Sequence, residues 1–179
     1  MQMIAERAEQ KGQILIIGDR SNDDFVADKP VSELPGIFLH PTVLESRFTP
    51  KSVALVRHPV DQWIHQQNQL GPNAPRLEIF MRGYRRFSEC LDGIGIVRFE
   101  DFLSDPASVL KAICNHLDAP YNADWETNWR EYNSVISEPS VKRPEGAAEV
   151  AFTDEIIQAF IANADYAPTL EKLGYADAS

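Results

Sequence analysis

Cysteine is scarce in this chain, and long hydrophobic runs are missing. The two cysteines, Cys90 and Cys114, are too few for a disulfide framework, and their separation does not match a set of metal ligands. The longest aliphatic run, Ile14–Ile17, falls far short of the roughly 20 residues that cross a bilayer, and the first residues hold no apolar stretch long enough for a signal peptide. We therefore expect a cytoplasmic protein that does not associate with a membrane.

Positive charge is also in short supply. Lysine and arginine total 17 residues against 27 aspartates and glutamates, which gives a formal net charge of -10. Because a phosphate backbone is bound through many basic contacts, we expect no nucleic acid among the partners. With 44% hydrophobic and 25% charged residues the composition is typical of a globular protein, and a length of 179 residues suits a single domain over 1–179.

Three short aliphatic segments stand out, at Gln13–Gly18, Ser52–Arg57 and Ile94–Phe99. Each is continuously apolar rather than alternating, which is typical of strands that are buried on both faces of a parallel sheet. We therefore predict three such strands.

Helical patterns separate and follow these segments. Apolar residues at helical spacing predict a helix over Pro75–Leu91, and Asp105 followed by Pro106 is a typical helix start, with Ile113 in the buried stripe of that helix. A further helix is expected after Thr153, with Ile161 facing inward. Strands that alternate with helices predict an α/β layered fold with right-handed crossovers.

Arg57 ends the second aliphatic segment, and Pro59 marks the start of a helix directly after it. Ligands gather at the carboxyl ends of strands in open α/β sheets, and a helix start there offers unpaired amides to an anion. Arginine grips a phosphate through two parallel charge-assisted hydrogen bonds, so Arg57 is a candidate phosphate clamp. The alternative is an ion pair between Arg57 and a neighbouring carboxylate, and spacing alone favours neither.

Several segments together resemble the sulfotransferase family, which transfers a sulfuryl group from 3'-phosphoadenosine-5'-phosphosulfate (PAPS). The segment RHPVDQWIH, which begins at Arg57, is similar to the family's segment for the 3'-phosphate of the donor. The stretch VRFEDFLSDPASVLKAICNHLDAPY is similar to the family's Arg-Tyr-Glu-Asp-Leu strand end and Asp-Pro helix, LEKLGY to its usual ending, and GDRSNDDF weakly to a segment of bacterial members. The resemblance implies a three-layer fold like that of the P-loop NTPases, with a parallel sheet and flanking helices.

The phosphate loop of that family, together with the strand that leads into it, has no match in this sequence. Four lost charge-assisted hydrogen bonds of ~1.5 kcal/mol each would weaken donor binding roughly ten-thousandfold, so we expect PAPS to bind weakly or with the help of a partner chain. Without that first strand, the strands at 53–56 and 95–97 either pair directly or expose edges that invite a protein partner or self-association.

The resemblance also implies roles for individual residues. Arg57 would hold the 3'-phosphate, His65 stands where the family has a serine, and Phe99 stands where the family has the tyrosine beside the adenine. The remaining candidates are His58 and Asp19 as a base near the acceptor, and Lys142 with Arg143 as a basic pair that closes over the 3'-phosphate.

Several of these candidates also have a structural interpretation. Phe99 fits a core position, Asp19 fits a turn, and a basic pair such as Lys142 and Arg143 is common in solvated loops.

Three functions compete at this point. The first is sulfuryl transfer to a hydroxyl or amine of a small-molecule or glycan acceptor. The second is a catalytically inactive sulfotransferase-like module that docks on a partner chain. The third is a metal site, since His58, Asp61 and His65 can share one helix face; we expect no metal there, because Pro59 can leave His58 outside the helix.

Overall fold

The computed structural model describes residues 6–8, 10–18, 25, 31–35, 49–128 and 150–175, and every structural statement below refers to them. The elements in these ranges mix helices with a small parallel sheet. In chain order they are η2 (Val31–Glu33), β1 (Val53–Val56), α3 (Pro59–Leu70), η3 (Gly71–Asn73), α4 (Leu77–Glu89), β2 (Gly95–Arg98), α5 (Phe99–Ser104), α6 (Pro106–His116), α8 (Asp154–Ile161) and α9 (Tyr166–Leu173).

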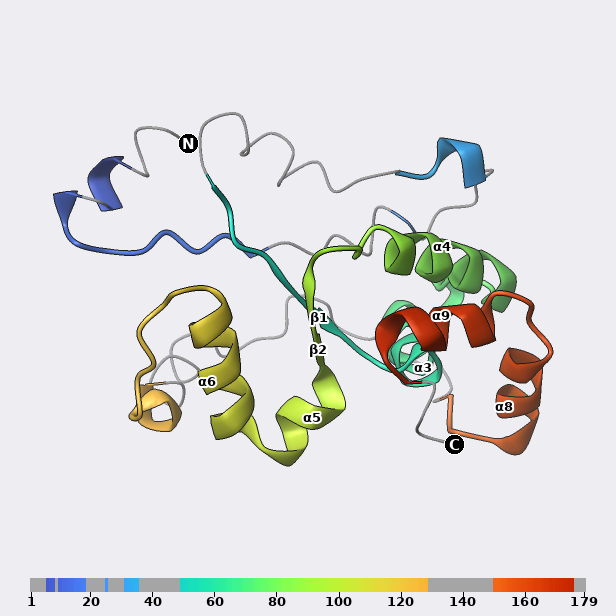
Figure 1. The fold of residues 1–179 in the computed structure, drawn as a ribbon. Coiled ribbons are helices and arrows are strands. Elements are labelled where there is room, and N and C mark those ends of the chain that lie inside the picture. The colour runs from blue at the N-terminus through green and yellow to red at the C-terminus, as the bar shows by residue number, and fades with distance from the viewer. Residues whose placement is uncertain are drawn as a thin grey trace.

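The two strands pair directly and in parallel, with Val53 opposite Gly95 and Val56 opposite Arg98. Two of the three predicted strands are therefore confirmed. Figure 1 shows α3, α4, α8 and α9 grouped on one side of the strand pair and α5 with α6 on the other. Within the described ranges the protein is a mixed α/β structure built on this pair.

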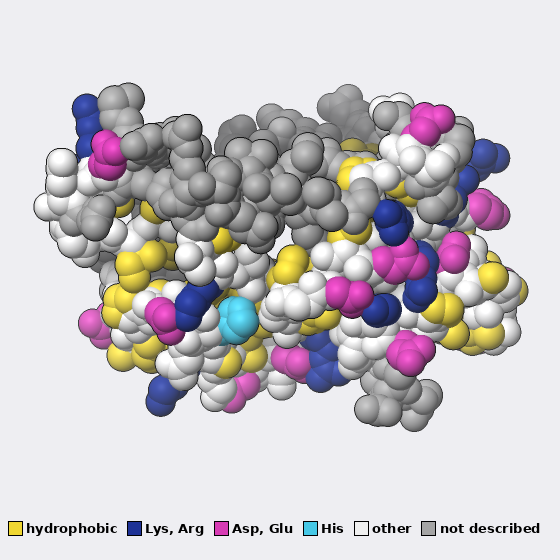
Figure 2. Space-filling view, turned by 45° about the horizontal axis from the view of Figure 1, so that its top comes forward, with side chains coloured by type: hydrophobic (Ala, Val, Ile, Leu, Met, Phe, Trp, Pro, Cys, Tyr) yellow, Lys and Arg dark blue, Asp and Glu magenta, His cyan; other side chains and the backbone are white. Residues whose placement is uncertain are grey.

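The predicted strand at Gln13–Gly18 is wrong, because this segment has no regular secondary structure and its side chains are not buried. Ile14 is 53% exposed and Ile16 is 71% exposed. Continuous aliphatic character alone does not form a strand when no ladder partner is in place. Figure 2 shows hydrophobic side chains at the surface on the side that carries this segment and α6.

The predicted helices are present, and capping explains where α6 and α8 start. Asp105 accepts a hydrogen bond from the Ser108 amide at 3.1 Å, and Pro106 occupies the first turn of α6, where a missing amide proton costs nothing. Thr153 caps α8 in the same way through the Ile156 amide. The inward placement of Ile161 is wrong, since its side chain is 58% exposed at the end of α8.

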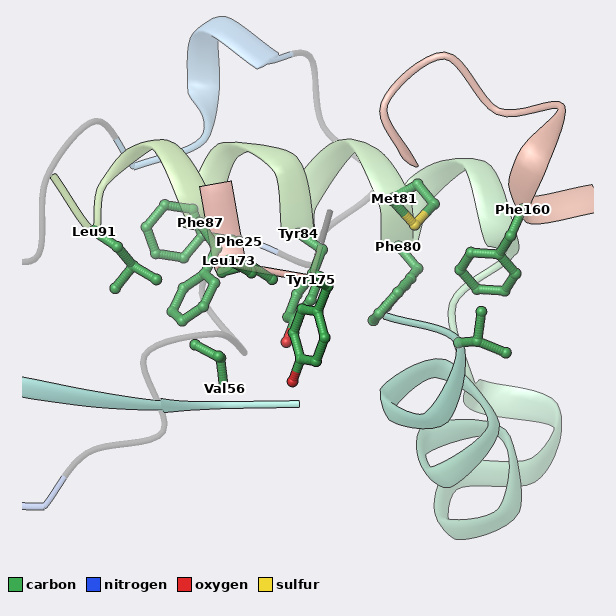
Figure 3. Close-up of a cluster of buried hydrophobic side chains, with 11 residues drawn as sticks. Phe25, Val56, Phe80, Met81, Tyr84, Phe87, Leu91, Phe160, Leu173 and Tyr175 are labelled. Atoms are coloured by element: carbon green, nitrogen blue, oxygen red, sulfur yellow. The ribbon is translucent and has the colours of Figure 1, made fainter. Parts of the chain in front are cut away.

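The hydrophobic core lies on the α4 side of the strands. Figure 3 shows its aromatic side chains between α4, β1, α8 and the end of α9. Phe80 is fully buried, with its ring stacked on Tyr84 at 5.1 Å and facing the Phe160 ring edge-on at 6.4 Å. By contrast, neither α5 nor α6 has a fully buried residue, and Ile113 is half-buried. Stability is therefore concentrated on one side of the strand pair.

Among the described residues, no helix has the length and apolar character needed to cross a membrane.

Replacing Phe80 by alanine should reduce the free energy of unfolding by about 3–5 kcal/mol, because the ring leaves a cavity among packed aromatic neighbours. Leu103→Ala is the control, since Leu103 is 63% exposed and its loss should cost less than about 0.5 kcal/mol. Urea denaturation followed by circular dichroism measures both. Similar losses for the two variants would contradict this assignment of the core.

Candidate functional site

The carboxyl ends of β1 and β2 place Arg57 and Phe99 side by side. Val56 pairs with Arg98, so the residues that follow, Arg57 and Phe99, leave the sheet at the same edge. The guanidinium carbon of Arg57 lies 5.3 Å from the centroid of the Phe99 ring. This cation–π contact presents a planar cation backed by an aromatic face. The two residues that the sequence assigns to phosphate and adenine are thus in contact.

No carboxylate pairs with Arg57 among the described residues, whose ion pairs all involve other basic side chains. Arg98, one residue before Phe99, is the contrasting case. Its guanidinium donates to both carboxylate oxygens of Asp101, at 2.7 and 2.9 Å, and to the Gly174 carbonyl at 3.1 Å. Of these two neighbouring arginines, Arg98 is therefore a structural residue, whereas the charge of Arg57 is not neutralised by a described carboxylate.

Tyr84 of α4 holds the backbone of Arg57. Its hydroxyl donates to the Arg57 carbonyl oxygen at 2.8 Å and lies 3.4 Å from the Arg57 amide nitrogen, which donates to it. Burial raises the pKa of this phenol far above its ordinary value, which keeps the proton on the hydroxyl. One core tyrosine thereby satisfies both backbone polar groups of Arg57 where the strand ladder ends.

Glu100 of α5 binds the backbone amide of His58, the residue after Arg57. One carboxylate oxygen accepts the His58 backbone amide at 2.9 Å, and the other accepts the Tyr175 hydroxyl at 2.5 Å. Burial alone would raise the pKa of Glu100, but the hydrogen bonds from Tyr175 and from the His58 amide lower it below its usual range. The ionised carboxylate therefore joins β1, α5 and the end of α9 at one point.

The His58 side chain packs against aromatic rings. It meets the Tyr175 ring edge-on at 5.1 Å and the Tyr166 ring at 6.2 Å. Burial lowers the pKa of His58 despite the opposing effects of Asp61 and Glu100, so the imidazole is neutral at pH 7. As expected from Pro59, His58 is the N-cap of α3 and not part of the helix, and its amide is already bonded to Glu100.

His65 lies on α3 near Arg57, at an exposed position. Partial burial lowers the pKa of its imidazole, and the positive charge of Arg57 lowers it further. A neutral imidazole keeps one N–H donor for a phosphate oxygen. Arg57 thus contacts Phe99 directly and acts on His65 through its charge.

Three predicted site residues, Asp19, Lys142 and Arg143, lie outside the described residues. The described ranges contain no group of three or more histidine, cysteine, aspartate or glutamate side chains that could hold a metal ion. His58, Asp61 and His65 therefore do not form such a group.

Sequence reasoning missed Tyr84, Glu100 and Tyr175 as parts of this site. Tyr84 reads as one more apolar position of α4, and Glu100 and Tyr175 lie 75 residues apart in the chain. The only sequence signal was that Glu100 and Tyr175 each fall within a segment that resembles the sulfotransferases.

Comparison with known proteins finds no matching family model, no similar curated protein and no similar solved structure.

The low pKa of Glu100 predicts an acid-sensitive contribution to stability. Because folding lowers this pKa, the contribution is present above the ordinary glutamate value of about 4.3 and is lost as pH falls through the lower value of the folded protein. The difference in unfolding free energy between wild type and Glu100→Gln should therefore shrink on acidification. Urea denaturation from neutral pH to about pH 3 tests this.

Glu171→Gln is the matched control, because Glu171 is exposed on α9 and its carboxylate has no hydrogen bond among the described residues. Its loss should change the free energy of unfolding by less than about 0.5 kcal/mol, as expected for an exposed side chain. A flat difference for Glu100→Gln over the pH range would show that the carboxylate does not hold the His58 amide and the Tyr175 hydroxyl.

Proposed function

We propose that this chain is a sulfotransferase-like domain that binds PAPS, or its product 3'-phosphoadenosine-5'-phosphate (PAP), at Arg57 and Phe99. The single observation that carries the proposal is the Arg57 guanidinium, which lies over the Phe99 ring at the carboxyl edge of two parallel strands and has no described carboxylate partner. In this proposal the fold is the three-layer P-loop type without its first strand, which agrees with the direct pairing of β1 and β2.

The geometry supports separate roles for the Arg57 guanidinium and the Phe99 ring in binding the nucleotide. The N–H groups of the Arg57 side chain make no hydrogen bond among the described residues, so they are available to the 3'-phosphate while the guanidinium carbon lies over the Phe99 ring. Neutral His65 adds a donor on the side of α3. The adenine would pack against the face of the Phe99 ring that Arg57 does not cover. These contacts recognise the nucleotide part of the donor and leave its sulfuryl group for a second site.

In the proposed reaction, a hydroxyl or amine of a small-molecule or glycan acceptor attacks the sulfur of PAPS. A new bond forms between the acceptor atom and sulfur, the bond from sulfur to the 5'-phosphate oxygen breaks, and PAP leaves. The proton of the acceptor passes to a base, for which His58 and Asp19 are the candidates. Catalysis of this kind depends mainly on positioning and on stabilising the charge of the transferring group.

A second candidate function, a nucleotide-binding module without transfer activity, is favoured by the surroundings of His58. Its imidazole packs against the Tyr175 and Tyr166 rings, and its amide is bonded to Glu100. A general base must come within about 3 Å of the acceptor atom whose proton it takes. The two rings and the bonded amide limit how far His58 can move to reach it. The module would keep the contacts of Arg57 and Phe99 with PAP and dock on a partner chain through the edge of its sheet.

Arg57→Ala should weaken PAP binding by about 2 kcal/mol, or roughly 30-fold, through loss of charge-assisted hydrogen bonds. Arg57→Lys should recover only part of this, because an ammonium does not reproduce the two parallel bonds. Arg76→Ala is the control, since Arg76 is exposed before α4. Isothermal titration calorimetry with PAP measures all four proteins. Equal affinities for wild type and Arg57→Ala would remove the proposed site.

The two candidate functions differ in one further result. A transferase consumes PAPS and releases PAP when a hydroxyl or amine acceptor is added, and Arg57→Ala slows that release. A binding module takes up PAP with the same dependence on Arg57 but releases none from PAPS with any acceptor. Chromatographic measurement of PAP over time separates the two.

A further inference from the structure

The end of α9 reaches into the candidate site as a hook, formed by Gly174 and Tyr175. Gly174 adopts a left-handed conformation with φ of 76°, which ends the helix, and the Tyr175 amide bonds back to the Leu170 carbonyl at 2.8 Å. This turn directs the Tyr175 ring into the core, where it is 6% exposed. The Tyr175 side chain, two residues beyond the end of α9, thus anchors this helix.

Three contacts hold this hook against the strand ends. The Tyr175 hydroxyl donates to Glu100 at 2.5 Å, the Arg98 guanidinium lies 5.5 Å from the Tyr175 ring centroid, and Arg98 also donates to the Gly174 carbonyl. Arg98 and Glu100 flank Phe99 in sequence. The hook therefore bonds to both neighbours of the ring that supports the Arg57 guanidinium.

Side chains from other elements hold the amide and carbonyl of Arg57 and the amide of His58. Tyr84 satisfies the Arg57 carbonyl and amide, and Glu100 satisfies the His58 amide that follows. Figure 3 shows Tyr84 and Tyr175 close together, with both hydroxyl oxygens directed toward the end of β1. A carboxylate has two oxygens, and here Tyr175 fixes one of them while the other binds the His58 amide.

We infer that Tyr175 is a positioning residue, which orients Glu100 and through it the backbone that carries Arg57, so that anion binding at Arg57 depends on docking of the C-terminal hook. This inference rests on the proposed function for its ligand. Without the phenol, the Glu100 carboxylate turns toward water, the His58 amide loses its partner, and the Arg57 guanidinium is no longer held over Phe99.

Tyr175→Phe tests this, because it keeps the ring against His58 and Arg98 and removes only the hydroxyl. Tyr166→Phe is the matched control: Tyr166 also lies beside His58, and its hydroxyl has no hydrogen bond among the described residues. Two measurements are made on the full chain. One is PAP affinity by calorimetry, and the other is hydrogen exchange of the His58 amide by nuclear magnetic resonance, relative to the amides of the β1–β2 ladder.

We expect Tyr175→Phe to weaken PAP binding roughly tenfold and to speed His58 exchange by a similar factor, with the ladder amides unchanged. Tyr166→Phe should change both by less than about twofold. A purely structural role would speed exchange of the ladder amides together with His58. That result, or unchanged PAP affinity in Tyr175→Phe, would overturn the inference.

The exchange measurement keeps the two proposals separate. If wild type does not bind PAP, the proposed function fails, and the hook is then judged on exchange alone. Faster exchange of the His58 amide in Tyr175→Phe only would still support the hook, whereas unchanged exchange would overturn it.

Discussion

The parallel pairing of β1 with β2 is the constraint on which the remaining structure depends. With Val56 opposite Arg98, the chain leaves both strands at one edge, and two pairs of consecutive residues, Arg57 with His58 and Phe99 with Glu100, meet there. An antiparallel pair, or a shift in register, would separate the cation from the ring. The candidate site is thus a consequence of strand direction and register, and the helices refine its geometry.

The core and the site share residues, which links stability to function. Tyr84 is 3% exposed in the aromatic cluster of α4, yet its hydroxyl holds the Arg57 backbone. Tyr175 likewise packs in the core and bonds to Glu100. Buried hydroxyls need partners, and the end of a strand leaves backbone groups that also need partners, so each satisfies the other. In this protein these bonds hold the backbone of Arg57 and His58 at the end of β1.

Local signals in the sequence predict local structure well. The apolar spacing of α4, the Asp105 cap of α6 and the aliphatic segments of β1 and β2 each report on a few neighbouring residues, and all are present. The segment at Gln13–Gly18 has the same aliphatic character but no ladder, because pairing depends on residues far away in the chain. For the same reason the contact of Glu100 with Tyr175, across 75 residues, has no local signature. Placement of Arg57 at a strand end is predictable, whereas its contact with Phe99 requires the register.

The central claim is that Arg57 and Phe99 together bind a 3'-phosphorylated adenine nucleotide. The most direct measurement is a nuclear magnetic resonance titration with PAP that follows the Arg57 side-chain N–H and the Phe99 ring, compared with adenosine, which has no phosphate. The account predicts saturable shifts of both signals with PAP and much weaker ones with adenosine. Equal responses to the two ligands, or shifts confined to other residues, would contradict it.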